Sequence, residues 1–233
     1  MKTRSAAARL WLVGLGLMAL SPTASATVQD PNALIAPYLK ARDDQAVGEI
    51  VGHARGDPAR PSEAPVPYEG VSVMLLPHSP GLEAELVAIK AHFRDSLTRY
   101  MDATADVTEA RAGYEHALLA AGGGELIRGE VSDARGVVRL AQMPAGEWML
   151  LAWRVQWHPA KTPKLKREDT TAFSDVTQST GHSIVTYWLM RLSVRPRETT
   201  EVELNDRNVW LTGVRQDVRV IEGAPKAGSR RRR

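Results

Sequence analysis

Apolar and polar residues alternate with a period of two in several short segments, a pattern that predicts β-strands. In EGVSVMLLP, for example, Val71, Val73 and Leu75 fall on one face of an extended chain. Comparable segments, separated by turn residues, recur along the chain: AVGEIVGHARG, ELIRGEVSD, GVVRLAQMP, GEWMLLAWRVQW, HSIVTYWLMRLSVRP, TTEVELND and NVWLTGVRQ. About seven to eight short strands at close spacing predict a mainly β protein, built as a β-sandwich.

A different pattern fills residues 82–121, where large or apolar residues recur every seven positions: Leu86, Phe93, Tyr100, Val107, Tyr114 and Ala121. This period is typical of a helix that packs on a partner, as in a coiled coil. One helix of about 40 residues would be about 60 Å long. A hairpin broken near DATADVTEA would be shorter, since Asp106 and Glu109 have the spacing of a capping box. Because the seven-residue repeat continues through DATADVTEA without interruption, we favour one long or kinked helix inserted at residues 81–122.

Two predicted strands are apolar on both faces. In EWMLLAWRVQW, Trp148 and Leu150 share one face while Leu151 and Trp153 share the other, and SIVTYWLMRLSV has the same character. A sandwich strand with one face in water alternates apolar with polar residues, so something covers the outer face of these two. The natural cover is the helical stripe of the insertion: Leu86, Ile89, Phe93, Leu97 and Tyr100. We expect part of the helix to pack there and its remainder to project or to self-associate.

The two ends of the chain differ from its body. Residues 1–26 contain three basic residues, an apolar run from Leu10 to Leu20 and the small-residue site Ala24-Ser25-Ala26, which together predict a signal peptide. No later stretch has the length of a membrane span. The predicted organisation is then an N-terminal segment at 27–46 with a short helix, a sandwich domain at 47–220 and a flexible basic tail at 221–233. The protein is expected to be exported, to the periplasm or the extracellular space.

The net charge of +3 comes from these ends. Without residues 1–26, Lys226 and the four terminal arginines, the body has 22 basic and 27 acidic residues. The body is mildly acidic, and the four terminal arginines are of a type that contacts nucleic acid, anionic lipid or an acidic partner. Because they follow EGAPKAGS as a flexible end of an exported protein, we do not expect a nucleic-acid partner. The chain has no cysteine, which excludes disulfides, thiolate catalysis and thiolate metal sites.

One stretch, DARGVVRLAQMPAGEW, combines two turns with two strand segments. Asp133 and Gly136 suit a tight turn, Pro144 ends a strand, and Gly146 permits the reversal before Trp148. This pattern resembles the hallmark of carboxypeptidase regulatory-like domains, which are transthyretin-like β-sandwiches related to starch-binding-like ones. VGEIVGHARG and PVPYEGVSVMLLP are similar to the first two strands of that family, and RPRETTEVEL to its closing hairpin, with Arg197 where a turn glycine is common. The resemblance implies a binding or structural module without catalytic residues, and it makes carbohydrate an admissible ligand.

Catalytic and metal-binding patterns are not evident. The six histidines form no recognisable metal motif, and the chain has neither a Gly-x-Ser-x-Gly elbow nor a phosphate-binding glycine loop. We therefore predict a non-enzyme without metal or cofactor.

The leading functional hypothesis is an envelope module whose helical insertion binds a protein partner or a second copy, with Phe93, Tyr100 and Tyr114 on the contact surface. The alternative is a carbohydrate-binding module that uses Trp157, at a strand end, with Lys161, Lys164 and Arg167 of the neighbouring polar loop.

Overall fold

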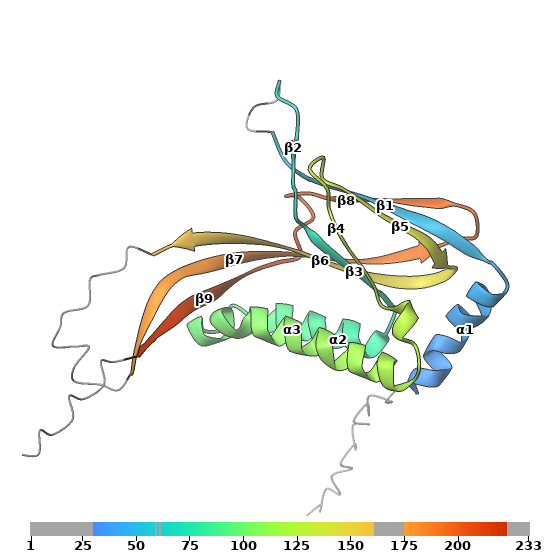
Figure 1. The fold of residues 1–233 in the computed structure, drawn as a ribbon, viewed down its shortest axis with the longest axis horizontal. Helices are drawn as coiled ribbons and strands as arrows, with labels where there is room; N and C mark the ends of the chain where they lie inside the picture. The colour runs from blue at the N-terminus through green and yellow to red at the C-terminus, as the bar shows by residue number, and fades with distance from the viewer. Residues whose placement is uncertain (1–29, 59, 61, 161–174, 223–233) are drawn as a thin grey trace, which may run out of the picture.

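The computed structural model describes residues 30–58, 60, 62–160 and 175–222 (Figure 1). Its elements, in chain order, are α1 (Pro31–Asp43), β1 (Val47–Gly56), β2 (Val66–Pro67), β3 (Ser72–Pro77), α2 (Pro80–His92), α3 (Leu97–Ala120), a 3-10 turn η1 (Gly124–Leu126), β4 (Arg128–Val131), β5 (Val137–Pro144), β6 (Gly146–Pro159), β7 (Asp175–Val194), β8 (Thr199–Leu204) and β9 (Leu211–Glu222). The predicted signal peptide and residues 223–233 of the predicted basic tail lie outside the described residues, while residues 221 and 222 belong to the last strand. No helix in the described part of the chain combines the length and hydropathy needed to cross a membrane.

The strands form two sheets, so the predicted β-sandwich architecture is confirmed. In the smaller sheet, β1 pairs with each of β2, β5 and β8. The larger sheet has the order β4-β3-β6-β7-β9. The strand pairs are antiparallel except that β8 runs parallel to β1, from Glu49 opposite Thr199 to Ala54 opposite Leu204. RPRETTEVEL was expected to close a hairpin, but β7 and β8 lie in different sheets. Arg197 adopts a left-handed backbone with φ 62° and donates its N–H to the Val47 carbonyl at 2.7 Å, which directs the chain to β1.

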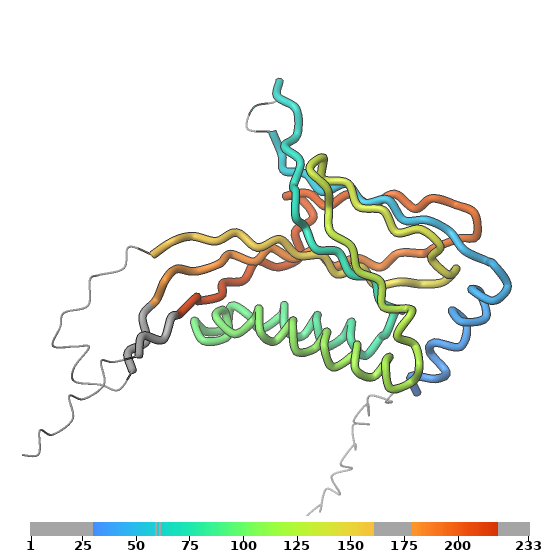
Figure 2. Tube along the Cα trace, in the orientation of Figure 1, coloured from blue at the N-terminus to red at the C-terminus, as the bar shows by residue number. Residues whose placement is uncertain are grey.

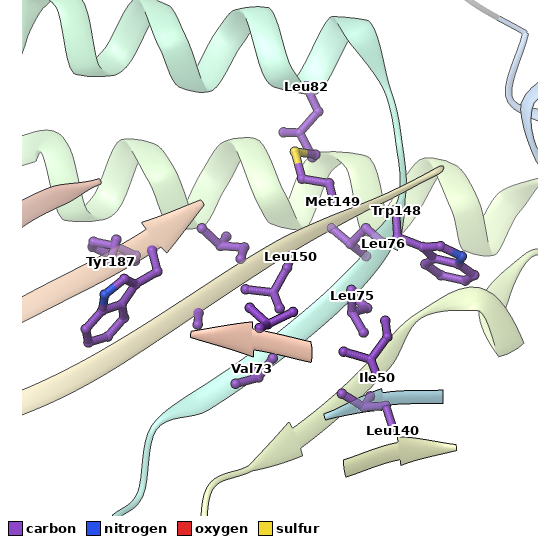
Figure 3. Close-up of a cluster of buried hydrophobic side chains, with 14 of the residues drawn as sticks. Ile50, Val73, Leu75, Leu76, Leu82, Leu140, Trp148, Met149, Leu150 and Tyr187 are labelled. Carbon is purple, nitrogen blue, oxygen red and sulfur yellow. The ribbon is translucent and has the colours of Figure 1, made fainter. Parts of the chain in front are cut away.

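The core lies between the sheets (Figure 3), with Ile50 and Leu140 from the smaller sheet and Leu75 and Leu150 from the larger. Trp148 closes one end, where its indole N–H donates to the Pro144 carbonyl at 2.9 Å. The ring of Tyr38, from α1, meets Trp148 edge-on with 5.1 Å between centroids. Helix α1 therefore covers the end of the sandwich.

The Asp133 turn is scaffolding, as its residue types predicted. The Asp133 carboxylate accepts the backbone N–H groups of Arg135 at 2.9 Å and Val137 at 2.8 Å. Gly136 has φ +73°, and a Cβ there would overlap the Ala54 carbonyl oxygen. Only glycine fits both conditions.

The insertion is a hairpin of two helices, so the expected single long helix is wrong. Helix α2 ends at His92, and Ser96 caps α3 by accepting the backbone N–H of Arg99 at 3.1 Å. The break lies upstream of DATADVTEA, whose residues Asp106 and Glu109 are inside α3. A regular seven-residue rhythm spans the turn because both helices direct apolar residues toward the protein, and sequence spacing alone does not reveal that the direction of the chain reverses between them.

The hairpin covers the outer face of the larger sheet (Figures 1 and 2). Three residues of helix α3 contact the strands of this sheet. Thr104 lies against Gly213 of β9, and the Arg111 guanidinium stacks 5.0 Å from the Trp153 ring of β6. The Tyr114 hydroxyl donates to the Pro77 carbonyl of β3.

The prediction that the insertion packs on these strands is confirmed, but the residues that make the contact differ from the expected ones. Helix α3 buries Ala103, Thr104, Val107, Ala110 and Leu118. Of the expected stripe, Leu86 is buried, while Leu97 is 77% exposed at the end of the hairpin.

Candidate functional site

Strands β6, β7 and β9 continue beyond the sandwich. Pairing of β3 with β6 ends at Ser72 opposite Trp153, whereas β6 stays paired with β7 as far as Pro159 opposite Gly181. Strand β9 accompanies β7 to Glu222 opposite Asp175. We call these three strands beyond Trp153 the extension. One of its faces is turned toward the hairpin (Figure 1).

A groove of about 200 Å³ lies between α3 and the hairpin-facing side of the extension. Its floor contains Leu151, Val185 and Tyr187, which are nearly fully buried. Its walls include Thr108 and Arg111 of α3, and Val155 and Arg215 of the strands. Arg111 also pairs with Glu115 at 3.2 Å, so the groove is polar at its rim without a large net charge.

Tyr187 carries the hydroxyl group among the residues on the groove floor. Burial raises the pKa of its phenol above the ordinary value, and the hydroxyl of Thr108 and the charge of Arg111 act in the opposite direction. The phenol therefore keeps its proton at neutral pH and can donate or accept a hydrogen bond.

An exposed aromatic side chain, the Trp157 platform, lies next to the groove in the register of the sheet. Two residues after Val155 on β6, Trp157 faces the same side of the sheet and lies opposite Ser183, which in turn lies opposite Arg215. The indole packs across Gly181, where a Cβ would stand 3.0 Å from the ring nitrogen. Trp157 is nevertheless 58% exposed. The absence of a side chain at Gly181 lets the ring lie against the strand with the rest of its surface in solvent.

A hydrogen-bonded polar cluster adjoins the ring. Ser183 donates its hydroxyl to Asp217 Oδ2 at 2.8 Å, and Arg215 Nε lies 3.7 Å from Asp217 Oδ1. Thr180 donates its hydroxyl to the Asp217 carbonyl at 3.1 Å. The cluster thus presents a carboxylate and a guanidinium held in place beside an exposed indole. Within the described residues, no group of three or more His, Asp or Glu side chains is placed to hold a metal ion.

The other predicted residues that the structure describes lie away from this site. Phe93 and Tyr100 lie together at the end of the hairpin, with 6.2 Å between ring centroids, and Arg94 stacks over Phe93 at 5.0 Å. Tyr114 donates its hydroxyl to the Pro77 carbonyl at 2.9 Å, and burial raises its pKa far above the ordinary value. Lys161, Lys164 and Arg167 lie outside the described residues.

Sequence reasoning proposed Trp157 as a candidate but did not single out Ser183, Arg215 and Asp217. These residues become neighbours of Trp157 only through the register of β6, β7 and β9. The one available signal was polarity, because Arg215 and Asp217 are two residues apart and share a face once the strand predicted at NVWLTGVRQ continues past Gln216.

Comparison with known proteins gives distant structural similarities. No protein-family model matches the chain, and no curated protein sequence matches it. The carboxypeptidase regulatory-like resemblance therefore stays an expectation. A solved structure of a presumed carbohydrate-binding protein from Pseudomonas aeruginosa is 14% identical, with 69% of this chain and 88% of that chain covered and a TM-score of 0.36.

Two pilins are also similar. The pilus backbone protein of Streptococcus pneumoniae is 14% identical, with 68% of this chain and 40% of that chain covered and a TM-score of 0.25. The minor pilin of Streptococcus agalactiae is 11% identical, with 78% and 100% covered and a TM-score of 0.25. Similarities at this level carry no argument about function.

Proposed function

We propose that this protein is a non-catalytic, exported carbohydrate-binding module whose glycan lies on the Trp157 platform and enters the adjoining groove. The observation that carries the proposal is the indole supported against Gly181 yet 58% exposed, beside the Ser183–Asp217–Arg215 cluster. A pyranose ring presents apolar C–H groups on its faces and hydroxyl groups at its edge. An aromatic side chain binds such a face at low entropic cost, and fixed polar groups select the hydroxyl pattern.

The groove supports a chain of sugars in preference to a single one. Val155 and Arg215 line it, and both are neighbours of the platform in the sheet register. A first sugar on Trp157 would therefore lie next to the groove, where the Arg215 guanidinium is a further donor for sugar hydroxyl groups.

Partner binding through the helical insertion, the leading hypothesis from sequence, receives less support. That hypothesis rested on a helical stripe of apolar residues for which the sequence showed no certain packing partner. In the structure, the apolar residues of α3 pack on the larger sheet of the same chain. The large apolar side chains that the hairpin exposes are separate in sequence: Val87, Leu97 and Leu119. Isolated exposed apolar residues are ordinary on protein surfaces.

The test compares glycan binding of the wild-type protein with two variants. Trp157→Ala removes the platform. His158→Ala changes the next residue, which is also exposed but faces the opposite side of the sheet, and so serves as the matched control. On an array of soluble polysaccharides followed by calorimetry, we expect the wild type and His158→Ala to bind alike. The Trp157→Ala variant should bind about tenfold more weakly or worse, since loss of an aromatic contact costs about 1.5 kcal/mol. Equal binding by all three proteins, or the lack of any glycan ligand for the wild type, would refute the proposal.

A further inference from the structure

Strand β9 is one of the two edge strands of the larger sheet within the described residues. It pairs with β7 along Leu211–Glu222, and in the part of the chain that the structure describes no strand pairs with its other side. Edge strands present unpaired backbone N–H and C=O groups, and proteins commonly protect them with proline or lysine. The twelve residues of β9, LTGVRQDVRVIE, contain neither, and the charged residues among them are of both signs, so they do not exclude a partner strand by like charge alone.

The side chains of β9 are complementary to themselves about Gln216. In an antiparallel pair of β9 strands centred there, Arg215 of one copy stands opposite Asp217 of the other, and this happens twice. Val214 likewise stands opposite Val218, which is 55% exposed in the single chain. Opposite charges and β-branched residues in directly opposed positions stabilise antiparallel pairs.

We propose that a second copy of this chain pairs with β9 in antiparallel orientation, about a two-fold axis at Gln216. The charges select this register, because an axis at Arg215 or Asp217 would place two like charges opposite each other. Asp217 can serve both copies, since its Oδ2 accepts from Ser183 while Oδ1 has only the 3.7 Å pair with Arg215 of its own chain.

In Figure 1, β9 follows β7 as the last strand of the larger sheet. The sheet continues as β6-β7-β9-β9-β7-β6, in which the two β6 strands are five strand spacings, or about 24 Å, apart.

A two-fold axis perpendicular to the sheet keeps equivalent faces on the same side, so both Trp157 platforms face one way. That consequence rests on the proposed function, because two platforms on one face would give a polysaccharide two attachment points. The dimer itself does not depend on glycan binding.

The first test uses cross-linking. The chain has no cysteine, so Gln216→Cys introduces a single thiol that can form a disulfide only between chains. Directly opposed residues of an antiparallel pair have Cα atoms about 4.5–5.5 Å apart, within the range that a disulfide spans. Under mild oxidation without glycan, we expect a predominant covalent dimer for Gln216→Cys. The control Gln156→Cys, an exposed position on the same face of β6, should stay mostly monomeric. Equal cross-linking of the two variants would overturn the proposal.

The second test exchanges charges. In Arg215→Asp, the new aspartate of each copy faces Asp217 of the other copy. In Asp217→Arg, the new arginine of each copy faces Arg215 of the other copy. Because like charges then oppose each other twice, each variant alone should dimerise at least about tenfold more weakly than the wild type. Mixed together, the two variants should form a heterodimer, detected by native mass spectrometry, because every opposed pair is then complementary. A monomeric wild type, or variants that dimerise normally alone, would overturn the pairing. Both readouts are made without glycan, so their failure leaves carbohydrate binding through Trp157 untouched, and failure of glycan binding leaves the dimer untouched.

Discussion

The contact between helix α3 and strand β9 depends on Gly213, and we expect Gly213→Ala to destabilise the protein. A Cβ at position 213 would overlap Thr104 Oγ1 and stand 3.6 Å from Thr104 Cβ and 3.7 Å from a methyl group of Leu211. Thr104 and Leu211 are both buried. Neither side chain can move into solvent, so the helix or the strand has to shift.

The magnitude follows from the cost of overpacking. One extra methyl group in a well-packed region costs about 1–3 kcal/mol. For a protein of this size, each kcal/mol lowers Tm by about 2–4 °C. The variant should therefore unfold at lower urea concentration with an unchanged slope, since the surface exposed on unfolding is the same.

The decisive assay is a double-mutant cycle with Thr104→Ala, which removes the overlapping hydroxyl. That single change costs about 1 kcal/mol or less, because the lost methyl is offset by the better helix propensity of alanine. In its background Gly213→Ala should cost close to nothing. Gly129→Ala is the control, since a Cβ there lies 3.9 Å from its nearest neighbour. If Gly213→Ala costs the same with and without Thr104→Ala, the helix does not press on the strand as described.

Three further predictions concern stability. Gly113 lies inside α3 with nothing within 4 Å of a Cβ, so Gly113→Ala should raise the free energy of unfolding by about 0.5–1 kcal/mol in urea titrations; a decrease would show that the position is crowded. Trp148→Phe leaves the Pro144 carbonyl without its indole donor and should cost about 1–3 kcal/mol, measured by the same titration, with a neutral effect arguing against that hydrogen bond. The Asp133 pKa is lowered, chiefly by the backbone N–H of Val137, so its stabilising effect is complete at neutral pH and is lost as the pH falls below the ordinary range for Asp. Asp133→Ala should therefore lower Tm at pH 7 and converge with the wild type in acid, whereas a constant difference in Tm would contradict this explanation.

The local pattern of the chain accounts for most of its elements. Alternation in EGVSVMLLP and its relatives predicted the strands, and the turn chemistry of Asp133 and Gly136 predicted a turn that the structure contains. Apolar residues on both faces of the central strands predicted that a cover lies on the outer sheet face, and Trp157 was expected to be exposed. These predictions succeed because each depends on which face a residue takes, and the period of the element determines that face.

The tertiary structure decided what depends on pairing between distant segments. Whether residues 82–121 form one helix or two depends on the gain from packing both α2 and α3 on the protein, against the cost of a four-residue turn. The parallel pairing of β8 with β1 and the meeting of Trp157, Ser183 and Asp217 depend on strand register. Register is set by the packing of whole sheets and by turns such as Arg197, so the sequence by itself determined the faces of the elements, and only the assembled sandwich decided which faces meet.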